Sequence, residues 1–509
     1  MSELELAGKL LENACQALES EMRGFALEAS LYTLQEGGSA RGEDWIKDLR
    51  DNRPKTDVWF EPEPWQKFAT DLQMVQEEVL RRTDVESMRD QVTGTARLFS
   101  TGTRLAYEFR RQLQEARVTP PTLEGLAQQA AVLRHFTEMW TIYQVAWEQR
   151  HKGESWHAEI EEGLTLRALR AGDRVVRDLY KVGQPDEVGQ PELDLIMGDQ
   201  WLIVVPFMGG LYAAGFDLPT PFIISPRWGH RLVWTWLGYA HEVGHHVYRN
   251  VKALSDELKV NVAVELWSRG EHYTVQRIWF HWIEEICADI FGLFRIGLAF
   301  AQAQQLMLPH LPFRVLQRVK EEGLDPREGL LRAADETHPI PYLRVFLAIR
   351  ALEKLGIPEA DIEPLREKWD ALFQSVDTSK VYALVQGRYV KLPIDTDSME
   401  KVGDIVLDVI LNTDLYALAK TSSPDTPRKL RDIFFEPLDE TQLEAARQAI
   451  RGVSSGGFDM RHLLAATQES LEKLWQEMGE KLSDEDINGL NRGVIEAIEA
   501  YQEPALSMF

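Results

Sequence analysis

The sequence predicts a mainly α fold with a small mixed β-sheet, an α+β class, on three observations. Most of the chain consists of amphipathic helical segments, such as "LAGKLLENACQALESEM" near the N-terminus. One window, from about 166 to 230, instead carries short β-branched and aromatic runs bounded by glycine and proline, as in "TPFIISP". With 509 residues, of which 44% are hydrophobic, the chain is long enough to bury a large core.

The pattern divides the chain into three regions. Residues 1–165 form a helical N-terminal region, and residues 166–350 form a core region that contains the strand window. Residues 351–509 are helical again, apart from a hairpin near 380–393 that turns at Gln386–Gly387. The only β-rich section of the sequence therefore lies within the core region.

Local signals place the elements inside these regions. Breaks at "EGGSARGED", "EPEPW" and "VTPPTLEG" separate the N-terminal helices, and Thr122 is suited to cap the helix that follows it. The strand window is expected to form a sheet from segments between about 170 and 226, packed against the next helix. Two long helices follow, near 231–250 and 275–300.

The charge of the chain limits its partners. Its formal net charge is −25, and binding to nucleic acid or to an anionic membrane needs a basic surface. Neither is therefore expected as the main partner. The two cysteines, Cys15 and Cys287, provide no disulfide framework, which suits a reducing compartment.

The sequence contains no convincing membrane or export signal. The N-terminal "MSELELAGKLLENACQ" is acidic and amphipathic, unlike a signal peptide. The most apolar run, Trp201–Phe216, is shorter than a spanning helix and is interrupted by Pro206 and three glycines. We therefore expect a soluble, cytoplasmic protein.

The stretch "AHEVGHHVYRN" carries the strongest chemical signal. His241 and His245 are four residues apart, so both rings lie on one face of a helix, with Glu242 beside them. In this H-E-x-x-H arrangement two imidazoles bind Zn²⁺ and the glutamate acts on a water. With 12 histidines and 81 acidic residues in the chain, chance gives at most roughly 0.045 such matches.

Two core histidines bonded to backbone are the alternative interpretation of this stretch. The flanking residues "LVWTWLGYA" and "VGHHVY" are apolar, which indicates a buried helix. Buried ionisable groups need partners, and a metal would satisfy both rings. We therefore favour one Zn²⁺ per chain.

A third ligand is expected from "FHWIEEICADIFG". Glu285 and Asp289 share one helix face, so Glu285 can reach the metal while Asp289 accepts the outer N–H of a zinc-bound histidine. Three alternatives to Glu285 stay open. Glu284 is adjacent but is expected to face another way, His281 shares the face of Glu285, and Glu265 lies nearer in sequence.

These motifs resemble those of the gluzincin metallopeptidases, of which thermolysin is the familiar example. The second motif of thermolysin reads N-E-x-x-S-D, and "EEICADIFG" is similar with Glu284 in place of the asparagine. In addition, "ETHPIPYLRV" is similar to the T-H-P…R segment of the branch that includes the CAAX prenyl proteases and the heat-shock membrane proteases. The resemblance implies a zincin-like catalytic core flanked by helical regions.

The resemblance also implies roles for two further residues. His338 would lie near the metal and stabilise the oxyanion, and Arg344 would help to organise the site. A helix N-terminal position before Pro339 is the alternative for His338. The match covers residues 241–344, and these relatives span membranes, so their lipidated or membrane substrates do not carry over.

The predicted mechanism is zinc-dependent hydrolysis of a peptide bond. Zn²⁺ held by His241, His245 and Glu285 activates a water, and Glu242 takes its proton and passes it to the leaving amine. The strand "PFIIS" resembles the edge strand that gluzincins pair with an extended substrate, although a buried core strand fits the same letters.

Two classes of function remain. The first is a soluble zinc metalloendopeptidase that acts on proteins or peptides, with a single dedicated target as one option. The second is a zinc-stabilised helical scaffold or regulator with an inactive or autoinhibited protease motif. Glu242 favours the enzyme, because a purely structural site does not need that carboxylate. The sequence does not predict the oligomeric state.

Overall fold

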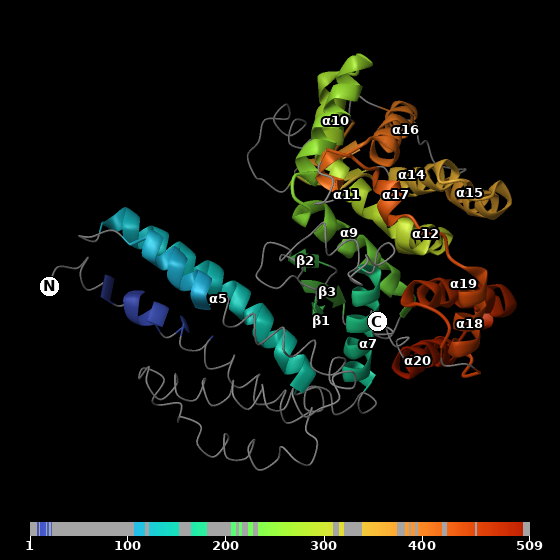
Figure 1. Cartoon of the computed structure of the whole chain (residues 1–509), viewed down its shortest axis with the longest axis horizontal. Coiled ribbons are helices and arrows are strands. Elements are labelled where there is room, and N and C mark those ends of the chain that lie inside the picture. Colours follow the sequence, from blue (N-terminus) through green and yellow to red (C-terminus); the bar gives the residue numbers. More distant parts are fainter. Residues whose placement is uncertain are drawn as a thin grey trace, which may run out of the picture. The chain divides into compact units, whose positions relative to one another are not determined.

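The protein divides into two compact units, and Figure 1 shows a computed structural model of the chain. The first unit comprises Met1–Leu166, Val205–Met208 and Asp217–Phe222. The second comprises Arg167–Val204, Gly209–Phe216 and Ile223–Phe509. The structure describes residues 8–9, 11–16, 18–19, 22, 106–117, 122–151, 164–180, 205–209, 213–215, 222–226, 233–308, 315–319, 338–373, 382–385, 388–391, 395–419, 425–453 and 456–501.

The described part of the first unit is helical. Its longest helix is α5 (Leu123–His151), and the predicted cap is confirmed, because Oγ1 of Thr122 accepts a hydrogen bond of 3.1 Å from the amide of Gly125. Phe109 and Phe136 are buried against each other, with ring centroids 5.0 Å apart. These rings anchor residues 106–115 to α5.

The second unit contains the histidine motif and is built from helices. They are α7 (Leu164–Tyr180, of which the first three residues belong to the first unit), η4 (Val233–Leu237), α9 (Gly238–Asn250), α10 (Leu254–Ser268), α11 (Tyr273–Ile296), α12 (Leu298–Met307), α14 (Pro341–Lys354), α15 (Glu359–Phe373), α16 (Thr396–Asn412), η5 (Tyr416–Leu418), α17 (Leu430–Phe434), α18 (Glu440–Ile450), α19 (Met460–Met478), η6 (Gly479–Lys481) and α20 (Asp484–Ala500). No helix in the described ranges is both long and apolar enough to cross a lipid bilayer.

The predicted α+β class with a small mixed sheet is wrong. Where side chains are described, the structure is 83% helical, and the core is made of helices. The strand segments are short stretches of three to five residues: β1 (Val205–Gly209), β2 (Ala213–Gly215), β3 (Phe222–Pro226), β4 (Val315–Val319), β5 (Tyr382–Val385) and β6 (Arg388–Lys391). The helices α11 and α10 and the 3₁₀ turn η4 pack against the histidine helix α9.

The length of α11 explains why the described core is helical. This 24-residue helix is buried on nearly every side from Ile283 to Ile296 and so supplies much apolar surface. The backbones of β5 and β6 pair antiparallel, with Val385 opposite Arg388, and β4 lies parallel to β5. These pairings lie far along the chain from the window near 170–226.

A glycine lets α9 and α11 approach closely. A Cβ at Gly244 would lie 2.7 Å from the Cα of Ala288 and 2.9 Å from its carbonyl oxygen. Real Cβ atoms do not approach backbone that closely, so the contact requires glycine on one side and a small residue on the other. The helices run antiparallel, as residue pairs 241–289 and 245–285 show. The motif residues of both helices therefore face each other.

The helix limits differ from the predicted ones at two places. The predicted helix near 231–250 begins with the 3₁₀ turn η4, and the amide of Val233 donates to Oδ1 of Asn491 at 2.9 Å. The predicted helix near 275–300 ends at Gly297, whose φ of +64° is accessible to glycine, and α12 begins directly after it. This bend brings α12 beside the histidine motif, where it lines the cavity described below.

Candidate metal centre

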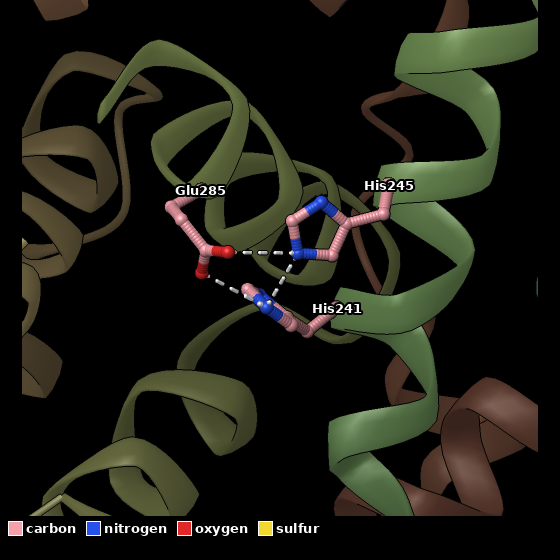
Figure 2. Close-up of side chains that lie close together, drawn as sticks. All are labelled: His241, His245 and Glu285. Atoms are coloured by element: carbon pink, nitrogen blue, oxygen red, sulfur yellow. Dashed lines mark hydrogen bonds and ion pairs between the residues drawn. The ribbon is translucent and has the colours of Figure 1, made fainter. Parts of the chain in front are cut away.

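Two histidines of α9 point toward α11. His241 and His245 lie one helical turn apart, with ring centroids separated by 4.6 Å and nearly perpendicular rings. Their Nε2 atoms are 3.0 Å apart, and Figure 2 shows both rings directed at the side chain of Glu285. The spacing in the sequence therefore brings two imidazole nitrogens to one point in space.

Glu285 completes a three-residue cluster from α11. Its Oε2 lies 3.4 Å from Nε2 of His241, and its Oε1 lies 3.3 Å from Nε2 of His245. One donor atom from each of the three residues falls within 4.8 Å of the other two, which is close enough to share a metal ion. The carboxylate is only 6% exposed, and its Oε2 makes no hydrogen bond of ordinary geometry.

Asp289 and Arg344 hold the outer nitrogen of His241. Oδ1 of Asp289 lies 2.8 Å from Nδ1 of His241. Arg344, from α14, donates to both oxygens of the same carboxylate, Nε to Oδ2 at 2.8 Å and Nη2 to Oδ1 at 2.7 Å. This two-point contact fixes the carboxylate, and the carboxylate fixes the ring. The sequence placed both residues in this supporting role.

Glu284 holds the outer nitrogen of His245, which the sequence did not predict. Its Oε1 lies 3.0 Å from Nδ1 of His245 and accepts a hydrogen bond of 2.6 Å from Nε of Arg249. The expectation that Glu284 faces another way is wrong, because α9 crosses α11 over both Glu284 and Glu285. The antiparallel pairing of the helices was the signal needed, and neither helix contains it alone.

The arrangement of nitrogens and carboxylates favours a cation at the centre. Because each Nδ1 faces a carboxylate, a neutral ring directs its Nε2 lone pair toward the other ring and Glu285. Two lone pairs and an anionic carboxylate at such distances repel one another unless a cation lies among them. A metal ion or protons on the imidazoles would remove this repulsion, so the three residues could hold a metal ion.

The pKa values show that the site favours positive charge on the histidines and negative charge on the carboxylate. Burial lowers the pKa of His241, but its hydrogen bonds to Asp289 and Glu285 raise it to about 10. Burial raises the pKa of Glu285, but the polar contacts with His241 and His245 hold it well below 4.5. Without a metal, the cluster therefore retains protons, and a metal ion must displace them on binding.

Zinc fits the donors and their spacing. Zinc binds nitrogen and oxygen ligands tetrahedrally at about 2.0–2.2 Å, which separates two ligand atoms by about 3.4 Å. The two Nε2–Oε distances, 3.4 and 3.3 Å, match this separation, and the Nε2–Nε2 distance of 3.0 Å is slightly shorter. Two imidazoles and one carboxylate also leave a fourth coordination position open, as catalytic zinc sites do.

A cavity of about 530 Å³ opens onto this cluster. Glu242 and His338 line it together with the three cluster residues. His338 is 58% exposed on its side chain, and its Nε2 lies 3.3 Å from Oε1 of Glu285. The lining also includes apolar residues from η4, from α12 and from the position after α12, namely Leu237, Phe300, Ala303, Met307 and Leu308.

The alternative ligands lie elsewhere. Glu265 pairs with Arg269 on α10 at 2.7 Å, and His281 is not among the three residues whose donor atoms converge. His246 contacts α7, where its Nδ1 lies 2.8 Å from the hydroxyl of Tyr180. Of the carboxylates considered from the sequence, Glu285 is therefore the one beside both histidines.

No protein-family model, curated protein or solved structure matches this chain.

Proposed function

We propose that this protein is a zinc metallopeptidase of the gluzincin type, which hydrolyses peptide bonds with Glu242 as general base. The observation that carries the proposal is the convergence of His241, His245 and Glu285 at the wall of an open cavity that Glu242 also lines. A structural metal site is enclosed by four protein ligands, whereas this set has three and faces space for a substrate.

Each residue has a defined task in this mechanism. A zinc ion bound here would lower the pKa of a water and polarise the scissile carbonyl. Glu242 accepts a proton from the attacking water and delivers it to the leaving amine. His338, on the exposed rim of the cavity, donates a hydrogen bond to the oxyanion as it develops. Asp289 and Glu284 fix the orientation of the two histidine rings by accepting from the Nδ1 atoms of His241 and His245.

The expected substrate is a protein or peptide, and the expected compartment is the cytoplasm. The cavity volume of about 530 Å³ suits one or two side chains of a peptide rather than a folded domain. Cys15 and Cys287 are both free and buried, which accords with a reducing compartment. One zinc per chain is sufficient for this mechanism.

The experiment compares wild type with Glu242→Gln. The amide has nearly the same shape as the carboxylate but cannot accept the proton, so cleavage of a peptide library should fall by at least ~10²-fold. Zinc content, measured by elemental analysis, should stay at about one per chain, because Glu242 is not among the converging ligands. The melting temperature should change little.

Glu265→Gln is the matched control, because it makes the same substitution on α10, away from the cavity. It should leave zinc content and cleavage unchanged. If Glu242→Gln cleaves as fast as wild type, the peptidase mechanism is wrong. If neither protein cleaves anything while both bind zinc, the zinc-stabilised scaffold becomes the better account.

A further inference from the structure

The two histidines of the metal centre are supported in different ways. Behind His241, Asp289 is buried and is gripped by Arg344 through two hydrogen bonds, one to each carboxylate oxygen. Behind His245, a single oxygen of Glu284 contacts both the ring and Arg249. Nothing in the H-E-x-x-H motif itself accounts for this second support.

The orientation of His245 depends on what its Nδ1 contacts. Only a ring with its proton on Nδ1 directs the Nε2 lone pair at the metal position, and a carboxylate at Nδ1 selects that form. Oε1 of Glu284, 3.0 Å away, is the acceptor in the right place. We propose that Glu284 and Arg249 form a positioning pair that holds His245 in its metal-binding orientation, in addition to the pair formed by Asp289 and Arg344.

Charge explains why the pair includes an arginine. Glu284 and Glu285 are consecutive residues of α11, and both contact His245, at 3.0 Å and 3.3 Å. Two neighbouring carboxylates repel each other, which would drive the side chain of Glu284 toward solvent. Arg249, one turn after His245 on α9, lies 2.6 Å from Glu284 and retains it beside the ring.

Arg249 can be tested for action through Glu284, as opposed to direct action on His245 or on the metal. Arg249 donates to Oε1 of Glu284, which is the atom that also contacts His245. If Arg249 acts on the ring through this carboxylate, its removal should act mainly while Glu284 is present. That dependence is measurable by a double-mutant cycle.

The experiment measures the zinc dissociation constant of the full chain by competition with a chromophoric chelator. Glu284→Ala should weaken zinc binding by about 10–100-fold, the usual effect of removing a carboxylate behind a histidine ligand. Glu284→Gln should recover most of the affinity, because its amide oxygen still accepts from Nδ1. Arg249→Ala should weaken binding by about 3–10-fold, since the acceptor is retained but loosened.

The double variant gives the sharpest result. Glu284→Ala with Arg249→Ala should bind zinc as Glu284→Ala alone does, because the proposal has Arg249 act on His245 through the carboxylate of Glu284. Cobalt substitution supplies a second readout, which a general loss of folded protein would lower in intensity but would not shift in wavelength. The visible absorption of bound Co²⁺ should change in Glu284→Ala and recover in Glu284→Gln, because it reports the coordination geometry.

The Glu265–Arg269 pair on α10 provides the control, with the same residue types at 2.7 Å outside the cavity. Glu265→Ala should leave the zinc dissociation constant unchanged. Equal affinity in wild type and Glu284→Ala, with both proteins folded by circular dichroism, would overturn the positioning role, as would independent effects of the two substitutions. This inference rests on the metal centre of the proposed function but not on cleavage, so its failure is distinct from the loss of peptidase activity tested with Glu242→Gln.

Discussion

Replacing Gly244 with alanine tests whether the close approach of α9 and α11 assembles the proposed metal centre. The added Cβ would meet the Cα of Ala288 at 2.7 Å, its carbonyl oxygen at 2.9 Å and the Cβ of Phe291 at 2.9 Å. None of these atoms can rotate away, so the helices must separate by at least about 0.7 Å to regain ordinary van der Waals contact.

Two effects on stability oppose each other, and their sizes decide the outcome. Alanine favours a helix over glycine by about 1 kcal/mol, whereas overpacking of a tight core costs about 1–3 kcal/mol. Zinc affinity should be more sensitive to this separation than folding stability is, because ligands must be held to within about 0.5 Å of their working geometry. We expect Gly244→Ala to be destabilised by about 1 kcal/mol and to bind zinc at least about tenfold more weakly.

The assay combines thermal denaturation of the metal-free protein with zinc titration. Gly489→Ala is the matched control, because Gly489 also lies inside a helix, α20, and a Cβ there meets nothing within 4 Å. That control should be stabilised by about 0.5–1 kcal/mol, with unchanged zinc affinity.

A second variant tests the nature of the overlap. Gly244→Ala combined with Ala288→Gly should not recover, because the closest overlaps are with the backbone of Ala288 rather than with its side chain. A Gly244→Ala protein as stable and as tight for zinc as wild type would refute the argument, and recovery in the double variant would refute its attribution to backbone.

Two further predictions concern the metal and acid stability. Glu285→Ala should lose most of the bound zinc by elemental analysis, whereas Glu265→Ala should retain it, and equal zinc in the two variants would remove Glu285 from the ligands. Burial raises the pKa of Asp459, but the hydrogen bond from His462 and the charge of Arg461 hold it below the ordinary 3.8. The ionised carboxylate therefore contributes stability above about pH 4, and this contribution is lost as the pH falls below that. In urea unfolding, Asp459→Asn should have a lower free energy of unfolding than wild type at pH 6, and the difference should shrink toward pH 3. A difference that does not change with pH would contradict this.

The histidine motif was predictable because its geometry is local. His241 and His245 share a face in any α-helix, and the same holds for Glu285 and Asp289. The distances between the two pairs required only that the two helices pack with these faces together. Apolar flanks and the closely packed Gly244 make that packing favourable.

Glu284 could not be assigned from helix phase alone. It is rotated by about 100° from Glu285 around α11, so a single helix suggests that only one of them faces the motif. Both contact His245, because α9 lies over the boundary between the two positions. The relation is tertiary, and the sequence of one helix carries no information about where the other crosses it.

The sheet was the least predictable part of the fold. Short apolar runs such as "PFIIS" are compatible with a strand or with part of a buried helix, and periodicity does not separate the two. The pattern also does not show which elements pack against α9, and among the described residues these are α10, α11 and η4. Long apolar helices offer more buried area than strands of three to five residues.

The chain order of the centre has a consequence during synthesis. His241, His245 and Glu285 emerge from the ribosome within one continuous stretch, α9 to α11, but Arg344 follows Asp289 by 55 residues. At about 5–20 residues per second, that interval lasts roughly 3–11 s. During it, the nascent helix pair contains the carboxylate of Asp289 without its guanidinium partner, and a buried carboxylate is costly unless other groups bond to it. Until α14 has been translated, Asp289 has His241 beside it, and its two hydrogen bonds from Arg344 form afterwards.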